Sequence, residues 1–152
     1  KEDLTADEYF VSPAKGKIIA LEEVPDKTFS QKLLGDGFAI DITDGKIIAP
    51  ISGKLETVFP SGHAFGIKGA NGEVLLHIGI DTVSLNGEGF DVKVKQGDFV
   101  KQGDVLVNVD LDKIHQLGKS TLTMVLFTEG NKVKNNNLNK EVQVNEQIDI
   151  TF

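Results

Sequence analysis

The chain has 152 residues, a formal net charge of −7 and no cysteine, and its sixteen basic residues are all lysine. A chain of this length is expected to form one domain with a core large enough to fold without disulfides. The composition excludes thiolate metal sites and thiol nucleophiles, and the acidic charge argues against nucleic acid, which is bound by neutralising phosphates with Lys and Arg.

Two further classes of function are constrained by the same composition. The longest stretch without a charged residue, Thr57 to Ile67, is too short for a membrane-spanning helix, which needs about 20 apolar residues. Arginine is the residue best suited to clamp a phosphate in a bidentate manner. A protein of this composition that handles phosphate must therefore use histidine, hydroxyl and backbone groups, or arginines of a partner.

The N-terminal segment carries no sign of a secretion signal. The first ten residues, KEDLTADEYF, are acidic and lack the basic-then-apolar order of such a signal. We expect residues 1–8 to form a flexible tail or linker and residues 9–152 to form a single domain. Because position 1 is not Met, we expect the sequence to have been trimmed or to be a piece of a longer protein.

Short runs of alternating apolar residues, separated by turn dipeptides, follow one another along the chain. The runs are Phe38/Ile40/Ile42, Val92/Val94, Val105/Val107/Val109, Val142/Val144 and Ile148/Ile150. Turn dipeptides between them include Asp36-Gly37, Asp44-Gly45, Asn71-Gly72 and Asn86-Gly87. Helical periodicity is confined to Lys27–Leu34 and Leu111–Leu117. This pattern predicts an all-β protein, an antiparallel sandwich or barrel with one or two short helical turns.

Two short motifs recur. Pro13-x-x-Gly16-Lys17 returns as Pro50-x-x-Gly53-Lys54. Val94-Lys-Gln-Gly-Asp98 returns as Val100-Lys-Gln-Gly-Asp104 and again as Val142-Gln-Val-Asn-Glu146. In the third copy Asn145 replaces glycine, as expected for a turn residue with left-handed backbone. The recurrences predict a fold built from a duplicated motif.

His77 lies in the most regular of the expected strands, Glu73–Asp81. Alternation places Val74, Leu76, Ile78 and Ile80 on a core face and Leu75, His77, Gly79 and Asp81 on the opposite one. This facing predicts an accessible imidazole with room beside it at Gly79 and an acid nearby. A surface histidine without a function and a functional one are about equally compatible with this pattern.

His63 is less clearly placed. Strict alternation would put it with Phe65 and Ile67, but Pro60 and Gly62 interrupt the register. Ser61 is close enough in sequence to orient its imidazole. The third histidine, His115, has polar neighbours at helical spacing and is interpreted as a surface residue.

Two histidines admit three chemistries. A catalytic zinc normally has three protein ligands, and neither H-x-H nor H-E-x-x-H occurs here. General acid–base catalysis is possible because histidine titrates near neutral pH. In the third, one imidazole carries a phosphoryl group covalently while the other binds its oxygens. The spacing alone does not decide among them.

The segment Leu76-His77-Ile-Gly-Ile-Asp-Thr-Val83, continuing to Leu85-x-Gly-x-Gly89-Phe90, resembles the phosphorylation-site signature of glucose-type enzyme IIA proteins of the bacterial sugar phosphotransferase system. Further matching segments, in the same order, are Gly35–Ile40, Pro50–Gly53, Gly62–Phe65 and Lys119–Thr123. The resemblance extends from about Val11 to Ile150. It implies an all-β antiparallel sandwich built from a duplicated motif.

The resemblance also implies roles for particular residues. His77 aligns with the phosphorylated histidine, His63 with its partner and Ser61 with a hydroxyl that orients that partner. Gly79 supports the site, and Asp36 and Asp81 fall on acids that border it. We expect Leu75, Phe59, Phe65 and Val83 to form the surface that meets partner proteins.

The implied donor is the phosphohistidine form of the carrier protein HPr, and the acceptor is a cysteine of a IIB domain of a sugar permease. Regulatory target proteins are further possible partners. No cofactor is required, although His63 and His77 could hold a zinc together with a partner's carboxylate. The expected location is cytoplasmic, and the tail lacks a basic amphipathic helix that would anchor it to a membrane. Two alternatives stay open, a zinc-dependent hydrolase with a duplicated β fold and a biotin- or lipoyl-carrier-like domain.

Overall fold

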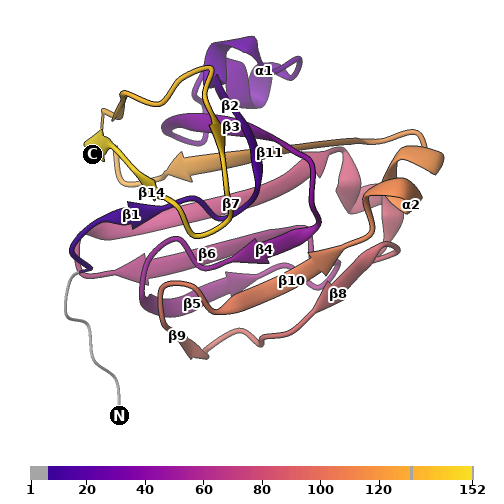
Figure 1. Ribbon diagram of the computed structural model, residues 1–152. Coiled ribbons are helices and arrows are strands. Elements are labelled where there is room, and N and C mark those ends of the chain that lie inside the picture. The colour runs from indigo at the N-terminus through magenta and orange to yellow at the C-terminus, as the bar shows by residue number, and fades with distance from the viewer. Residues whose placement is uncertain (1–6, 131, 152) are drawn as a thin grey trace.

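The computed structural model describes residues 7–130 and 132–151, and it confirms the all-β architecture (Figure 1). The strands are β1 (Phe10–Val11), β2 (Gly16–Ala20), β3 (Asp36–Ile42), β4 (Lys46–Ile48), β5 (Gly53–Val58), β6 (Ala64–Gly69), β7 (Gly72–Ile80), β8 (Phe90–Val92), β9 (Phe99–Val100), β10 (Val105–Val109), β11 (Ser120–Phe127), β12 (Lys134–Asn135), β13 (Glu141–Val142), β14 (Gln147–Ile148) and β15 (Ile150–Thr151). The helical segments are α1 (Lys27–Ser30), α2 (Leu111–Gln116) and the 3₁₀ turns η1 (Leu21–Glu23) and η2 (Thr82–Leu85). Both helices lie inside the ranges in which helical periodicity was found.

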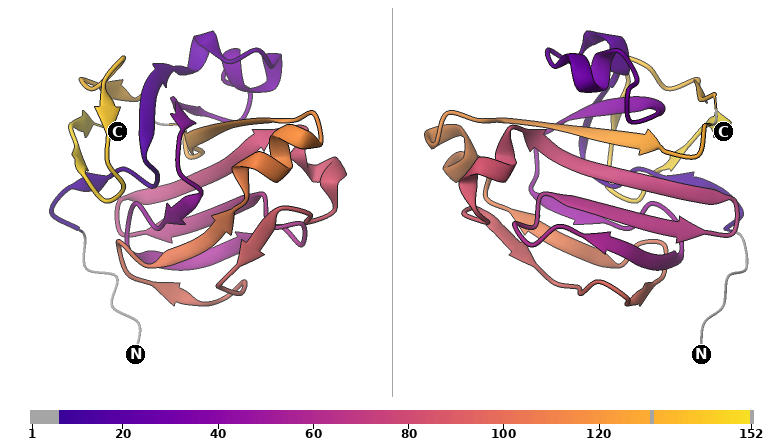
Figure 2. Two further views of the ribbon diagram at one scale, coloured as in Figure 1. Left: turned by 45° about the vertical axis from the view of Figure 1, so that its right-hand side comes forward. Right: turned by 180° about the vertical axis from the view of Figure 1, so that it is seen from behind.

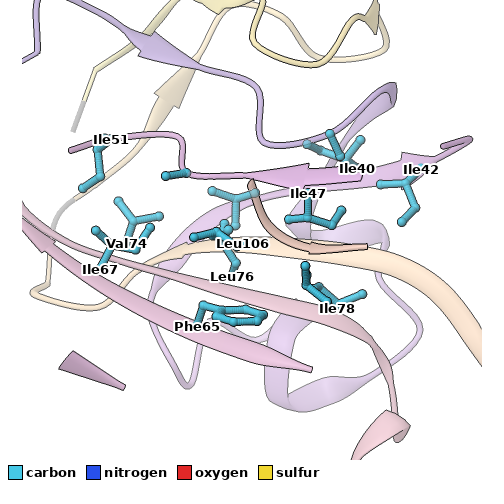
Figure 3. Close-up of a cluster of buried hydrophobic side chains, with 14 of the residues drawn as sticks. Ile40, Ile42, Ile47, Ile51, Phe65, Ile67, Val74, Leu76, Ile78 and Leu106 are labelled. Carbon is cyan, nitrogen blue, oxygen red and sulfur yellow. The ribbon is translucent and has the colours of Figure 1, made fainter. Parts of the chain in front are cut away.

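One large antiparallel sheet dominates the molecule. Its strand order is β13-β2-β3-β11-β7-β6-β5-β9, and a smaller sheet, β4-β10-β8, packs over it. Side chains from the two sheets interdigitate, so that Ile47 and Leu106 of the small sheet meet Phe65, Leu76 and Ile78 of the large one (Figure 3). The inward-facing Phe38, Ile40 and Ile42 of β3 belong to the same core, as their alternation predicted.

A second apolar cluster covers the other face of the large sheet. Leu21, Val24 and Phe29, from η1, α1 and their connection, pack against Ala39 of β3 and Met124 and Leu126 of β11. In Figures 1 and 2 these helical segments lie above the sheet. Strand β11 is therefore buried on both faces, which explains its unbroken apolar run Met124–Phe127.

The duplicated motif is visible in the backbone hydrogen bonds. The N–H of Ile48 donates to the carbonyl of Pro13 at 2.9 Å, and the N–H of Val11 donates to the carbonyl of Pro50 at 3.4 Å. Each donor lies two residues before the proline of its own copy. The two copies thus exchange equivalent hydrogen bonds, as the predicted duplication requires.

The second repeated motif forms the same turn three times. The N–H of Lys95 donates to the carboxylate of Asp98 at 2.9 Å, and that of Lys101 to Asp104 at 2.8 Å. In the third copy the N–H of Gln143 donates to the carboxylate of Glu146 at 2.8 Å. The residue with left-handed backbone is Gly97 (φ 95°) in the first copy, Gly103 (φ 98°) in the second and Asn145 (φ 69°) in the third. The prediction that Asn145 takes the left-handed conformation of the glycines is confirmed.

Two details differ from the predicted pattern. A register shift in β10 turns both Leu106 and Val107 inward and leaves Val105 half-buried, because a bulge interrupts strict alternation. Asp7, assigned to the tail, accepts hydrogen bonds from the N–H and hydroxyl of Ser52 at 2.8 and 2.7 Å. Its side chain is therefore held by the domain, and the remainder of the expected tail, residues 1–6, lies outside the described residues.

Candidate functional site

His77 lies in the middle of the large sheet. Strand β7 runs between β6 and β11, and His77 is paired with Ala64 on one side and Met124 on the other. As predicted, Val74, Leu76 and Ile78 point into the core opposite His77. The imidazole is half-buried on the opposite face of the sheet, because Phe29 of α1 packs against it with ring centroids 4.9 Å apart. The open surface expected around His77 is thus partly covered by α1.

The backbone at Gly79 holds one nitrogen of His77. Gly79 has φ 81°, a left-handed conformation that favours glycine, and its carbonyl accepts a hydrogen bond from Nδ1 of His77 at 3.0 Å. A carbonyl only accepts, so Nδ1 carries the proton and Nε2 keeps its lone pair. The bond to Gly79 thereby selects the nucleophilic nitrogen.

The same conformation corrects the predicted facing of Ile80. Ile80 packs with Leu75 against the second apolar cluster and not with Leu76 in the main core. The left-handed turn at Gly79 and a register shift between Ser120 and Thr123 of β11 end the alternation there.

His63 lies just before β6 and is 2% exposed. It follows Gly62, whose φ of 77° turns the chain, so the alternation of β6 does not set the direction of its ring. Its Nδ1 and the hydroxyl of Ser61 are 2.5 Å apart, which confirms the predicted contact between these two residues. Its carbonyl accepts from the N–H of Ile78 at 2.7 Å, which ties it to the residue after His77.

Four rings form a row through the site. Phe29 contacts His77, His77 contacts His63 with centroids 5.1 Å apart, and His63 contacts Phe59 with centroids 5.1 Å apart. Burial, and next the neighbouring His77, lower the pKa of His63 to about 4. Burial also lowers the pKa of His77, although its hydrogen bond to Gly79 opposes the shift. Both imidazoles are therefore predominantly neutral near pH 7.

Two acids act on His77 electrostatically, and one of them was missed from the sequence. The charges of Asp26 and Asp81 both raise the pKa of His77, against the effect of burial. Asp81 is exposed and follows β7 directly, as expected. Asp26 caps α1 by accepting from the N–H of Thr28 at 2.9 Å. An aspartate just before a short helical pattern is a recognisable capping signal, but it does not tell where that helix packs.

The structure places Asp36 away from the two imidazoles, so its expected place at the border of the site stays a prediction. Asp36 is paired with Phe127, which is paired with Val74, so it lies two strands across and three residues along from His77. Those offsets correspond to roughly 10 Å in each direction. Its carboxylate accepts from the N–H groups of Gly37 and Val133 at 2.8 and 2.9 Å and pairs with Lys32 at 3.3 Å. Asp36 is thus engaged in joining chain segments.

Two of the four residues expected on the partner surface are exposed. Phe59 and Val83 are 40% and 57% exposed. Phe65 is fully buried, because it pairs with Leu76 on the inward face of β6, so its assignment to the surface is wrong. Leu75 is half-buried and packs against the second apolar cluster. Two large apolar side chains that the sequence analysis missed, Leu33 and Leu34, are exposed just after α1.

His115 is exposed and its Nε2 lies 3.0 Å from the hydroxyl of Thr121, in agreement with its interpretation as a surface residue. Within residues 7–130 and 132–151, His, Asp and Glu form no group of three that could hold a metal ion. The pair of His63 and His77 fits a zinc ion only if another molecule supplies further ligands. In the same part of the chain no helix is both long and apolar enough to span a membrane.

Comparison with known proteins gives a consistent result. The family model described as phosphoenolpyruvate-dependent sugar phosphotransferase system, EIIA 1, matches residues 8–133. The glucose-specific EIICBA component of Streptococcus pneumoniae is 49% identical over 140 residues, which are 91% of this chain and 19% of that protein. The glucosamine-specific EIICBA component of Bacillus subtilis is 48% identical over 124 residues, which are 81% of this chain and 20% of that protein. The chain therefore spans about a fifth of these two relatives.

A solved structure is also similar to this chain. The glucose permease IIA of Mycoplasma capricolum superposes with a TM-score of 0.85 at 43% identity, over 93% of this chain and 94% of that one. These matches give no support to a zinc hydrolase or to a biotin or lipoyl carrier. The fold, the paired imidazoles and the matches define a phosphotransferase domain. The chain belongs to the EIIA 1 family of the phosphoenolpyruvate-dependent sugar phosphotransferase system.

Proposed function

We propose that Nε2 of His77 accepts a phosphoryl group from the phosphohistidine of HPr and passes it to a cysteine of a IIB domain. The observation that carries this proposal is the hydrogen bond from Nδ1 of His77 to the Gly79 carbonyl, because it leaves Nε2 unprotonated. The family to which the chain belongs supports the choice of donor and acceptor.

The transfer can be written without moving the proton on Nδ1. The lone pair of Nε2 attacks the phosphorus, the donor's P–N bond breaks, and the donor imidazole, protonated on its other nitrogen, leaves as a neutral ring with the electron pair. The His77 ring then bears a positive charge, which the Gly79 carbonyl and the carboxylates of Asp26 and Asp81 stabilise. In the second step a thiolate attacks the phosphorus and His77 leaves as the neutral ring with Nδ1 still protonated. Positioning and charge stabilisation are the main tasks of the protein in such a reaction.

His63 is proposed to bind the transferred group. If the hydroxyl of Ser61 donates a hydrogen bond to Nδ1 of His63, then Nδ1 is unprotonated and Nε2 of the neutral ring carries the proton. That N–H can donate a hydrogen bond to a phosphoryl oxygen. A hydrogen bond to such a charged oxygen contributes roughly 1.5–3 kcal/mol. Because the chain contains no arginine, the remaining negative charge must be met by cations and N–H groups of the partner.

The partner is proposed to dock on the apolar residues that flank the two histidines. Phe59 contacts His63 and is exposed, Val83 is exposed in the turn after β7, and Leu33 and Leu34 follow the helix that covers His77. Asp26 and Asp81 would anchor the partner's basic residues at the border of this surface. An apolar centre with a charged rim is typical of a transient interface, which buries about 1,200 Å² or less.

The relatives suggest the setting of this reaction. Both curated relatives are EIICBA components named for glucose or glucosamine, and the chain matches about a fifth of each. We infer that the chain works on the cytoplasmic side, as the IIA part of such a sugar permease or as its free-standing counterpart. Any regulatory partner would use the same apolar surface, and any shared zinc would require that partner's carboxylate.

The test is phosphorylation of the protein by phosphoenolpyruvate, the first enzyme of the system and HPr, followed by intact mass measurement. We expect one acid-labile, base-stable phosphoryl group, located on His77 by peptide mapping. His115→Ala, which changes an exposed histidine, is the matched control and should be phosphorylated like the wild type. A phosphoryl group that persists in His77→Ala would overturn the assignment.

A further inference from the structure

Thr82 is a fully buried polar residue that the phosphoryl transfer described above does not use. It begins η2 directly after the left-handed residue Asp81, with 0% of its surface exposed. Its hydroxyl donates to the carbonyl of Ile78 at 2.5 Å. That carbonyl belongs to the peptide group that joins Ile78 to Gly79, the residue whose own carbonyl holds His77.

The side chain of Thr82 also limits the space around Gly79. A Cβ atom placed on Gly79 would lie 2.3 Å from the methyl carbon of Thr82 and 2.6 Å from the carbonyl oxygen of Ser120. Gly79 is therefore enclosed by the Thr82 side chain and by the backbone of β11. The methyl group restricts Gly79 from one direction, while the hydroxyl fixes the orientation of the preceding peptide plane.

These two contacts determine where the Gly79 carbonyl points. The φ angle of Gly79, 81°, and its ψ angle together relate the peptide plane that Thr82 holds to the plane that contains the Gly79 carbonyl. The first plane is held by Thr82, and the pairing of Ile80 with Ser120 of β11 holds the second plane from its other end. The Gly79 carbonyl then stays 3.0 Å from Nδ1 of His77.

We propose that Thr82 is a positioning residue for phosphoryl transfer. Its hydroxyl holds the Ile78–Gly79 peptide so that the Gly79 carbonyl keeps the proton of His77 on Nδ1 and leaves Nε2 free to attack phosphorus. Thr82 acts through the backbone and does not touch the transferred group. This inference rests on the proposed function of His77.

Two substitutions separate the hydroxyl from the methyl group. Thr82→Val keeps the shape and removes the hydroxyl, whereas Thr82→Ser keeps the hydroxyl and removes the methyl. Thr123→Val is the matched control, because Thr123 is also 0% exposed and its hydroxyl donates to a nearby backbone carbonyl, that of Thr121, at 3.1 Å. Thr123 pairs with Ile78 in the sheet, and its hydroxyl bonds to the Thr121 carbonyl rather than to the peptide before Gly79.

The experiment measures the His77 tautomer by ¹⁵N NMR of the unphosphorylated protein, together with the rate of HPr-dependent phosphorylation and thermal unfolding. For Thr82→Val we expect a mixture of Nδ1–H and Nε2–H tautomers and a rate about tenfold lower, as for the loss of one hydrogen bond of ordinary strength. Thr82→Ser and Thr123→Val should retain the wild-type tautomer and rates within about twofold. If Thr82→Val does not fold, Thr82→Ala replaces it, and we expect the same mixture of tautomers and the same loss of rate.

Three outcomes would overturn the proposal. They are an unchanged tautomer and rate in Thr82→Val, a tautomer lost equally in Thr123→Val, and a tautomer lost in Thr82→Ser. The NMR measurement needs no donor protein, so it tests the positioning even if the wild type accepts nothing from HPr. A wild-type protein that accepts no phosphoryl group from HPr would contradict the proposed function of His77, but the tautomer measurement would still test the role of Thr82.

Discussion

The imidazoles of His63 and His77 meet edge to face, with their planes at 78° and their centroids 5.1 Å apart. One ring comes from the turn before β6 and the other from the interior of β7, and the backbone bond between His63 and Ile78 holds the two segments together. At this separation a phosphoryl group on one ring lies within reach of the other. Each ring is enclosed on its far side by a phenylalanine, Phe29 or Phe59.

The first prediction concerns the second histidine. His63→Gln should leave the fold intact, because glutamine also donates a hydrogen bond at similar reach. It should slow transfer to a IIB domain more than acceptance from HPr, since the negative phosphoryl group on His77 favours protonation of the otherwise neutral His63, and glutamine cannot take up that proton. The two half-reactions are measured separately by rapid quench. Wild-type rates in both would show that His63 has only a structural role.

The second prediction concerns stability and pH. The pKa of His63 is lowered to about 4 in the folded protein from 6.5. Between these values the unfolded chain binds a proton that the folded protein does not, so stability is greatest above pH 6.5 and falls as the pH decreases toward 4. The loss attributable to His63 is up to about 3 kcal/mol. It is measured as the difference in unfolding free energy between wild type and His63→Gln across this range, and a pH-independent difference would contradict the shift.

The third prediction separates docking from packing. Val83 is 57% exposed, so Val83→Asp should change stability by less than about 0.5 kcal/mol while reducing HPr-dependent phosphorylation severalfold. Leu75 packs against the second apolar cluster, so Leu75→Asp should destabilise the fold by about 1–3 kcal/mol. This corrects the view of Leu75 as a free surface residue. Thermal unfolding and phosphorylation are measured for both variants, and a Val83→Asp variant with wild-type kinetics would remove Val83 from the docking surface.

The fourth prediction concerns the acids. Asp26→Asn and Asp81→Asn should each reduce the rate of phosphoryl acceptance at low salt, with a smaller effect at high salt, because charges at a border act through screened attraction. Asp36→Asn is the comparison variant and should leave the salt dependence unchanged, since Asp36 lies two strands away. Rates are measured across a salt series. If Asp36→Asn alone alters the salt dependence, the anchoring role belongs to Asp36 after all.

Much of the site could be predicted because it depends on local pattern. The alternation in β7 predicted the face on which His77 lies, and the repeated turns predicted left-handed backbone at Asn145. The expected contact of His63 with Ser61 is present, and Gly79, expected to support the site, accepts a hydrogen bond from His77. Each of these features is decided within a few residues of the sequence position concerned.

The features that were missed depend on which segments pack together. Alternation assigns a residue to a face but does not say what covers that face, so the packing of Phe29 on His77 could not be read from β7. For the same reason Asp26 was passed over for Asp36, which stands in a more conspicuous segment but points to other partners. Phe65 was misplaced because the interrupted register before β6 left its facing undecided.

The reciprocal hydrogen bonds between the two Pro-x-x-Gly copies have a consequence for how the domain can be divided. Ile48 donates to Pro13 and Val11 donates to Pro50, so each copy completes the backbone of the other. A fragment containing one copy would leave an orphan donor and an orphan acceptor where its counterpart belongs. The halves of this domain are therefore interdependent, and we expect a chain cleaved between the two copies, in the exposed turn at Asp44, to recover its structure only as a complex of the two pieces.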